Sequence, residues 1–124
     1  LATRIYKIGK YRSRIKVLNE DGIKLTQKYL GNKNTFIYLD PPYFKKGAML
    51  YLNHYKEDDH TKLANLLNEN ANRNWVLTYD ELAKIKRLYP ERNRKRISLK
   101  YRVHDPRNAN ELMIFSDSIS GFIR

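Results

Sequence analysis

Short apolar runs alternate along the chain with longer stretches in which apolar residues recur at helical spacing. The runs are rich in β-branched and aromatic residues, which favours strands, and the spaced stretches favour amphipathic helices. Strands are predicted at residues 14–18, 35–39, 75–77, 97–100 and 112–115. Helices are predicted at residues 21–30, 58–67 and 80–88.

Polar residues and proline mark where the predicted helices begin and end. Asp21 is suited to cap the first helix, and residues 31–34 close it. Asp58 or Asp59 is suited to cap the second helix. Pro90 ends the third, because proline cannot continue a helix.

The order of the predicted elements is β-α-β-α-β-α-β-β. Strands that alternate with helices indicate an α/β fold with a mostly parallel sheet and right-handed crossovers. The last two strands have no helix between them, so a C-terminal antiparallel hairpin is expected. Many doubly wound domains share this order, and it therefore predicts a fold class and not a function.

Length and composition narrow the class of protein. The 124 residues fit one domain, and 41% hydrophobic residues is ordinary for a globular protein. The sequence has no cysteine, which excludes a disulfide framework and fits a reducing, cytoplasmic setting. It has no apolar run of membrane-spanning length, so no membrane partner is expected.

A strong positive charge favours nucleic acid as the partner. The chain has 25 Lys and Arg against 13 Asp and Glu, a net charge of +12. The basic residues gather in residues 1–18 and 84–102, whereas acidic residues gather at 57–59. A surface that is merely soluble would mix the two signs more evenly, so the clustering favours a phosphate backbone such as that of DNA.

Asp40-Pro41-Pro42-Tyr43 is the segment with the clearest chemistry. It follows the apolar run at residues 36–39, so it is expected at the carboxyl end of a buried strand, where open α/β sheets bind ligands. The two prolines fix the backbone with little conformational freedom left to lose. A turn that only ends the strand is the alternative interpretation.

These residue types suit capture of a flat ring that carries an amino group. The exocyclic nitrogen of adenine is a poor nucleophile because its lone pair is delocalised into the ring. Acceptors on its two N–H groups localise that pair, and Asp40 and the carbonyl of Pro41 can supply them. Tyr43 can stack on the ring, which contributes about 1–3 kcal/mol per base. A base in a duplex has to be flipped out to reach such a site.

In these residues the chain resembles the D12-class (Dam-like) N6-adenine-specific DNA methyltransferases. Residues 36–43 are similar to motif IV of that family. The order and spacing of later segments extend the resemblance to about residues 14–117. These segments are residues 17–22, 55–67, 75–80, 85–89 and 110–114, of which the first is the weakest match.

The resemblance implies a partial Rossmann-like methyltransferase fold and S-adenosylmethionine as methyl donor. It implies that Asp40, Pro41, Pro42 and Tyr43 are catalytic and bind the target amine, and that Asp40 also borders the donor. Glu20 or Asp21 would approach the adenosine of the cofactor. DNA is the implied substrate, with restriction–modification as the setting and no metal ion required.

The sequence departs from the family in one respect. The family has a Phe-x-Gly-x-Gly loop near its N-terminus that approaches the cofactor, and the five glycines here are too scattered to form it. The expectation is therefore a C-terminal part of the catalytic domain at residues 14–124. Residues 1–13 would be a remnant of a target-recognition region, and an N-terminal half would supply the missing loop.

Two other functions remain open from the sequence. The chain can be an inactive remnant that only binds nucleic acid, or it can methylate amino groups in RNA. The three histidines have no metal-binding spacing, and His60 is expected to pack or cap at a helix start. Tyr51 and Tyr55 can line the pocket of a flipped base or pack in the core.

Overall fold

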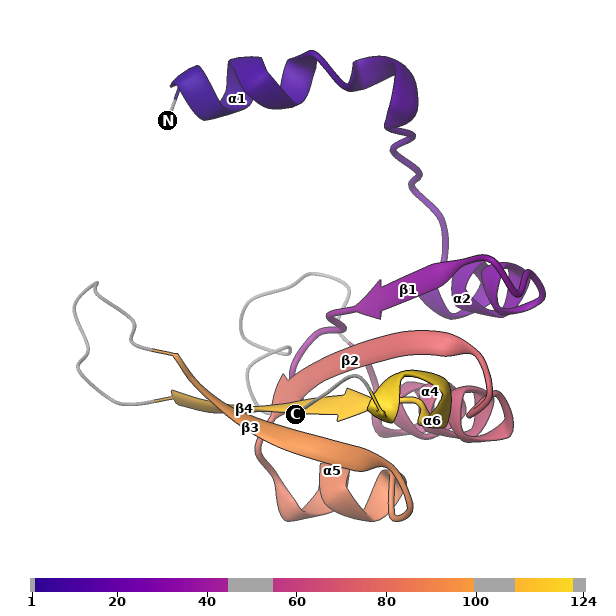
Figure 1. The fold of residues 1–124 in the computed structure, drawn as a ribbon. Helices are drawn as coiled ribbons and strands as arrows, with labels where there is room; N and C mark the ends of the chain where they lie inside the picture. The colour runs from indigo at the N-terminus through magenta and orange to yellow at the C-terminus, as the bar shows by residue number, and fades with distance from the viewer. Residues whose placement is uncertain (1, 45–54, 100–108, 122–124) are drawn as a thin grey trace.

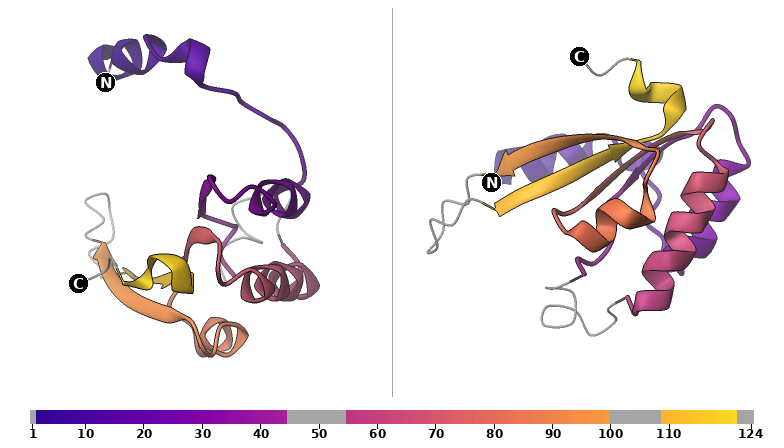
Figure 2. Two further views of the ribbon diagram at one scale, coloured as in Figure 1. Left: turned by 45° about the vertical axis from the view of Figure 1, so that its right-hand side comes forward. Right: turned by 90° about the horizontal axis from the view of Figure 1, so that it is seen from below.

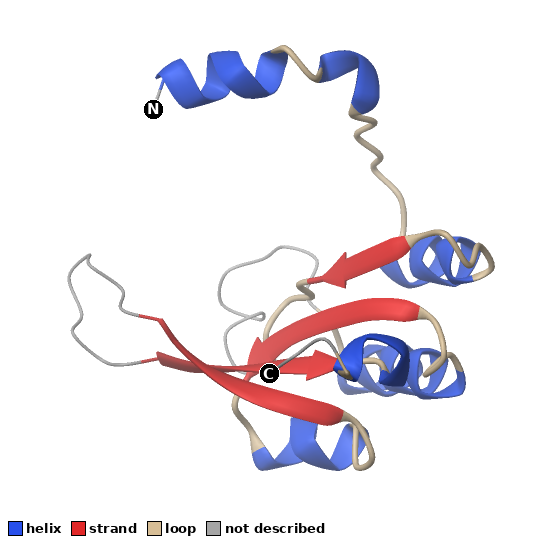
Figure 3. Cartoon of the chain, viewed as in Figure 1, coloured by secondary structure: helices blue, strands red, loops and turns tan. Residues whose placement is uncertain are grey.

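The computed structural model describes residues 2–44, 55–99 and 109–121, and its elements are drawn in Figures 1 and 3. Its helices are α1 (Ala2–Gly9), the 3-10 helix η1 (Arg12–Arg14), α2 (Gly22–Leu30), α4 (Glu57–Glu69), α5 (Ala83–Leu88) and α6 (Asp117–Ser120). Its strands are β1 (Phe36–Leu39), β2 (Asn74–Asp80), β3 (Asn93–Leu99) and β4 (Ala109–Phe115).

The described strands form one mixed sheet in the order β1-β2-β4-β3. β1 pairs in parallel with β2, and β4 pairs antiparallel with both β2 and β3. The predicted C-terminal hairpin is therefore confirmed. A mostly parallel sheet was predicted, but two of the three pairings of the described strands are antiparallel. The reason is that β4 lies between β2 and β3 and runs opposite to both. Only one parallel pair is present among the described strands.

Helices α2, α4 and α5 cover one face of the sheet (Figure 2). The apolar stripe of α4 is buried as its spacing predicts, with Leu63 and Leu67 at most 1% exposed against Trp75 and Leu77 of β2. Burial of each such leucine contributes about 1.5–3 kcal/mol. This packing places α4, which connects β1 to β2, directly against β2.

The start of α4 differs from the prediction. The helix begins at Glu57, so Lys56 and not Asp58 or Asp59 occupies the N-cap position. Asp59 still satisfies a backbone donor, because its carboxylate accepts a hydrogen bond from the Lys56 amide at 3.0 Å. Asp21, in contrast, caps α2 as predicted and accepts from the Lys24 amide at 2.8 Å.

The strand predicted at residues 14–18 is wrong. Residues 12–14 form η1, and residues 15–19 continue without strand pairing. No strand of the described residues lies beside this segment, so Ile15 and Val17 stay exposed, Val17 to 89%. α1 also has no buried residue and stands apart from the sheet (Figures 1 and 2).

The helix predicted at residues 80–88 begins later, at Ala83. Strand β2 continues to Asp80 because Thr78, Tyr79 and Asp80 pair with β4. The neighbouring strand thus overrides the local helical pattern, and residues 81–82 connect the two elements.

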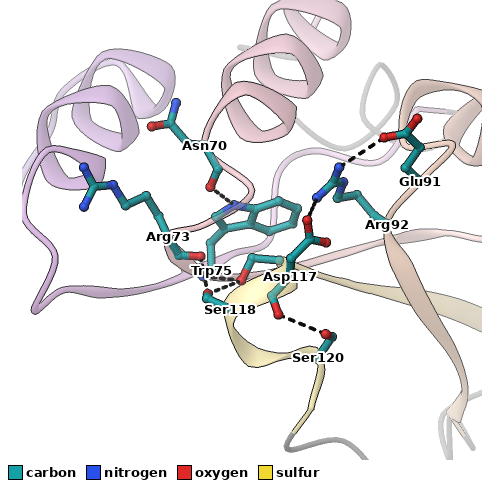
Figure 4. A network of polar contacts seen from close by, with 9 residues as sticks. Asn70, Arg73, Trp75, Glu91, Arg92, Asp117, Ser118 and Ser120 are labelled. Carbon is teal, nitrogen blue, oxygen red and sulfur yellow. Dashed lines mark hydrogen bonds and ion pairs between the residues drawn. The ribbon is translucent and has the colours of Figure 1, made fainter.

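A polar network joins the C-terminal segment to the start of β2 (Figure 4). The Trp75 indole donates to the Asn70 carbonyl at 3.0 Å, and the Ser118 hydroxyl donates to the Arg73 carbonyl at 2.7 Å. The largely buried Arg92 side chain forms ion pairs with Asp117 at 2.6 Å and with Glu91 at 3.7 Å. These contacts fix β2 at the end opposite to Asp40.

We predict that Asp117→Asn destabilises the fold and that Glu91→Gln does not. Asp117 forms the shorter pair with Arg92, and its loss should cost about 1–2 kcal/mol, less than for a fully buried pair because this carboxylate is half exposed. Glu91 is 84% exposed and its pair is long. Urea unfolding of the two variants measures the difference, and equal midpoints would contradict this role for Asp117.

Candidate functional site

Asp40, Pro41, Pro42 and Tyr43 lie at the carboxyl end of β1, as the sequence predicts. Side chains alternate along β1, so Ile37 and Leu39 pack against the core whereas Phe36 and Tyr38 are exposed. Pro41 is buried, and Asp40 before it is exposed. The segment therefore has its backbone fixed in the fold and its carboxylate at the surface.

The carboxylate of Asp40 is held by a side chain of the neighbouring strand. The parallel register places Leu39 opposite Leu77, so the next residues, Asp40 and Thr78, lie side by side. The Thr78 hydroxyl donates to Oδ1 of Asp40 at 2.9 Å, and the Tyr38 hydroxyl lies 3.1 Å from the same Thr78 oxygen. Because Thr78 has a single proton and gives it to the carboxylate, Tyr38 donates to Thr78.

This arrangement leaves one oxygen of Asp40 available. Within the described residues, Oδ2 of Asp40 accepts no hydrogen bond, and its side chain faces solvent. A carboxylate with one oxygen anchored and the other open has a defined direction for a further N–H donor.

Tyr43 is anchored to the antiparallel strand β4. Its hydroxyl donates to Oε1 of Glu111 at 2.5 Å, and Glu111 is only 8% exposed. The ring is half buried against the core. The segment is thus attached to β2 through Asp40 and to β4 through Tyr43, so it cannot shift as a free loop would.

A pocket of about 570 Å³ lies beside this segment. It extends along β1 and the start of α2, and most of its lining is apolar or aromatic. The lining residues outside β1 are Gly22, Leu25, Thr26, Tyr29, Thr35, Asp40, Pro41, Pro42, Tyr55 and Leu63. A flat apolar ring with a polar edge fits such a lining better than a charged ligand does.

Tyr55 connects this pocket with the N-terminus of α2. Its hydroxyl is so close to Gly22 that a Cβ added there would lie 3.3 Å from it. Burial, followed by the charges of Asp21 and Asp59, raises the pKa of Tyr55 above its ordinary value. The sequence left the role of Tyr55 open, and the structure places it in the pocket wall.

The two acidic residues predicted to approach a cofactor differ in position. Asp21 caps α2 next to the pocket residue Gly22, and its charge acts on Tyr55. Glu20 is exposed, and neither Glu20 nor Asp21 is itself among the pocket residues. Asp21 is therefore the better placed of the two, although its carboxylate already accepts the Lys24 amide.

Sequence reasoning missed two residues of the site, Thr78 and Glu111. Thr78 lies within an apolar strand, and only the register of β1 against β2 shows that it reaches Asp40. Glu111 is a buried acid in an apolar strand, which is itself a signal, because such residues are rarely buried without a partner. No group of three or more metal-ligating side chains is present among the described residues.

A family model for the D12 class of N6 adenine-specific DNA methyltransferases matches residues 2–104. The match spans most of the sequence, and the chain belongs to this family. Members are adenine-N6 DNA methyltransferases that depend on S-adenosylmethionine. A search of curated proteins finds no match to the chain. Among the described helices, none has the length and apolar character needed to cross a membrane.

We predict that Asp21→Asn lowers the pKa of Tyr55 and that Glu20→Gln leaves it unchanged. Removing the negative charge of Asp21 makes the Tyr55 phenolate less unfavourable, while the part of the shift that burial causes remains. Asparagine is also a good N-cap, so α2 is retained. Titration of ¹³C-labelled tyrosines by NMR measures the shift, and an equal pKa in both variants would contradict the placement of Asp21.

Proposed function

We propose that this chain transfers a methyl group from S-adenosylmethionine to the N6 amine of an adenine flipped out of DNA. The observation that supports this most directly is the Asp40 carboxylate, anchored through one oxygen and open through the other at the rim of an aromatic pocket. Family membership supplies the reaction class, and the geometry supports Asp40-Pro41-Pro42-Tyr43 as the residues that perform it.

In this proposal the segment binds the target amine through two acceptors. Oδ2 of Asp40 accepts one N–H of the amine, and the carbonyl of Pro41 accepts the other. The nitrogen lone pair is then localised and directed away from the acceptors, toward the methyl donor. Charge-assisted hydrogen bonds of this kind contribute about 1.5–3 kcal/mol.

The bound donor supplies an electrophilic methyl carbon on a sulfonium. The N6–C bond forms as the C–S bond breaks, and the electron pair of that bond stays on sulfur. The amine nitrogen gains positive charge during this step, and the negative charge of Asp40 stabilises it. The surplus amine proton then leaves to the Asp40 carboxylate and from there to water.

Tyr43 stacks on the flipped base in this proposal. Its hydroxyl bond to Glu111 fixes one end of the ring, so little side-chain freedom is left to lose when the base arrives. Pro41, Pro42 and Tyr55 line the neighbouring pocket, whereas Tyr43 is not among its lining residues. Stacking contributes about 1–3 kcal/mol, which offsets part of the cost of unstacking the base from the duplex.

We assign the contact with DNA phosphate to the exposed basic residues of β3 and of the N-terminal segment. Lys95 is exposed on β3, whereas Arg96 and Lys86 both pair with Glu81. Hydrogen bonds from Arg96 and then from Lys86 lower the pKa of Glu81 to about 2. The charges of Arg96 and Lys86 are thus partly neutralised by Glu81. We propose that exposed basic residues outside this cluster, such as Lys95, contribute most to DNA binding.

We further propose that an N-terminal half completes the donor side of the site, in a DNA-methylation or restriction–modification setting. β1 is an edge strand of the described sheet, and its large apolar side chains Phe36 and Tyr38 are each 59% exposed. Such apolar edge residues favour a covering segment. Residues 1–13 are then assigned to a target-recognition region, consistent with the exposed basic helix α1.

The role of Asp40 is tested by Asp40→Ala, which should reduce methyl transfer by about one to two decades or more, since a charge-assisted hydrogen bond is lost. The assay uses the full-length protein, labelled S-adenosylmethionine and either duplex DNA or structured RNA. Asp58→Ala, at an exposed carboxylate of α4, is the matched control and should retain full activity. Full activity of Asp40→Ala would contradict the proposal, and preference for RNA would favour the RNA alternative.

The anchoring of Asp40 is tested separately by Thr78→Val, which keeps the shape of the side chain and removes its hydroxyl. We expect kcat to fall about tenfold, because a charge-assisted hydrogen bond that orients Asp40 is lost. Thr78→Ser should restore most of the activity because the donor is retained. Thr61→Val, at an exposed threonine of α4, is the control. Unchanged kcat in Thr78→Val would show that Asp40 needs no anchor.

A further inference from the structure

His60 is a buried residue that the proposed reaction does not use. It lies in the first turns of α4 and is 2% exposed. Its ring contacts three aromatic rings, with centroid distances of 4.7 Å to Phe44, 5.5 Å to Tyr55 and 5.6 Å to Tyr79. The sequence predicted a packing or capping residue, and packing is confirmed.

The rings that His60 contacts belong to two sides of the candidate site. Phe44 directly follows Tyr43, so its position constrains the residues proposed to bind the base. Tyr55 lines the pocket and reaches Gly22 at the start of α2, next to Asp21. One imidazole ring therefore contacts both the base side of the site and the wall that faces α2.

A hydrogen bond fixes the orientation of the His60 ring. Nδ1 of His60 lies 2.7 Å from the Tyr79 hydroxyl. Burial raises the pKa of Tyr79 above its ordinary value, so the hydroxyl keeps its proton. Within the described residues this hydroxyl has no other hydrogen-bond partner. Tyr79 must then donate to Nδ1, and the ring proton of His60 is on Nε2.

The charges around His60 act in both directions. Burial is the largest cause and lowers the pKa of His60, which keeps the ring neutral near pH 7. Asp80 at the end of β2 and Asp59 and Glu57 on α4 act to raise it, and Lys84 on α5 acts to lower it. In a neutral ring with its proton on Nε2, Nδ1 can accept the hydrogen bond from the Tyr79 hydroxyl.

Lys84 is a second residue that contacts the Phe44 ring. Its ammonium lies 4.5 Å from the centroid of the Phe44 ring and forms an ion pair with Glu57. Phe44 thus contacts both the His60 ring and a cation, and these two contacts limit its movement. The residue that follows the Asp40–Tyr43 segment is therefore fixed by two elements, α4 and α5.

We propose that His60 is a positioning residue, which holds Phe44 and Tyr55 in place so that the residues that bind the base and the pocket wall that faces α2 keep their relative positions. The expected effect on catalysis rests on the proposed function. The structural coupling of the two sides through His60 does not depend on it.

The kinetic test compares Tyr79→Phe and His60→Asn with the matched control Tyr89→Phe in the full-length protein. Tyr79→Phe removes the bond that orients His60, and His60→Asn keeps a polar partner for Tyr79 and removes the ring contacts. Both should lower kcat about ten- to a hundredfold with KM for DNA unchanged. Misplacing the reacting groups slows the chemical step, whereas the contacts with DNA phosphate are kept. Tyr89 is buried and its hydroxyl has no partner among the described residues, so Tyr89→Phe should keep kcat.

A second readout is independent of methyl transfer. In His60→Asn, NMR signals of both Tyr43 and Gly22 should shift, and ¹⁵N spectra of the wild-type ring should show the Nε2–H tautomer. Signals that change only around His60 itself, or a kcat that stays at the wild-type level, would overturn the proposal. If the wild-type protein transfers no methyl group, the proposed function fails while the NMR comparison still decides the coupling.

Discussion

The parallel pairing of β1 with β2 is the constraint on which the candidate site depends. Its register places Asp40 beside Thr78, and no other register would join these two side chains. The pairing requires the crossover helix α4 to pack on the sheet, which the burial of Leu63 and Leu67 stabilises. The hydrophobic core thus determines the direction of a surface carboxylate through the register of two paired strands.

Buried polar groups then fix the irregular backbone that follows β1. A loop of this kind would move if only apolar contacts held it, because such contacts have no preferred direction. The Tyr43–Glu111 and Tyr79–His60 hydrogen bonds are directional and lie in or near the core, where an unmade bond is costly. Glu111 of β4 and His60 of α4 therefore hold Tyr43 and Phe44, which belong to neither element.

The sequence allowed the end of β1, the helix α2 with its Asp21 cap and the family to be predicted, because each depends on local patterns. It did not reveal that residues 14–18 form no strand or that β2 continues to Asp80, since both depend on which strand lies alongside. Thr78 was missed for the same reason, as a hydroxyl in an apolar strand has no local signal. Pairing partners, and not propensities, account for these differences.

Charge and aromatic chemistry occupy different parts of the molecule. The exposed lysine of β3 and the basic residues of α1 lie away from the pocket, whose lining is mostly apolar. Phosphate attraction acts over a distance of about 10 Å in dilute salt and needs no fixed geometry, whereas amine capture needs atoms placed to within a fraction of an ångström. The basic residues can therefore stand on exposed elements such as α1, while the amine site requires the paired strands and buried hydrogen bonds around Asp40.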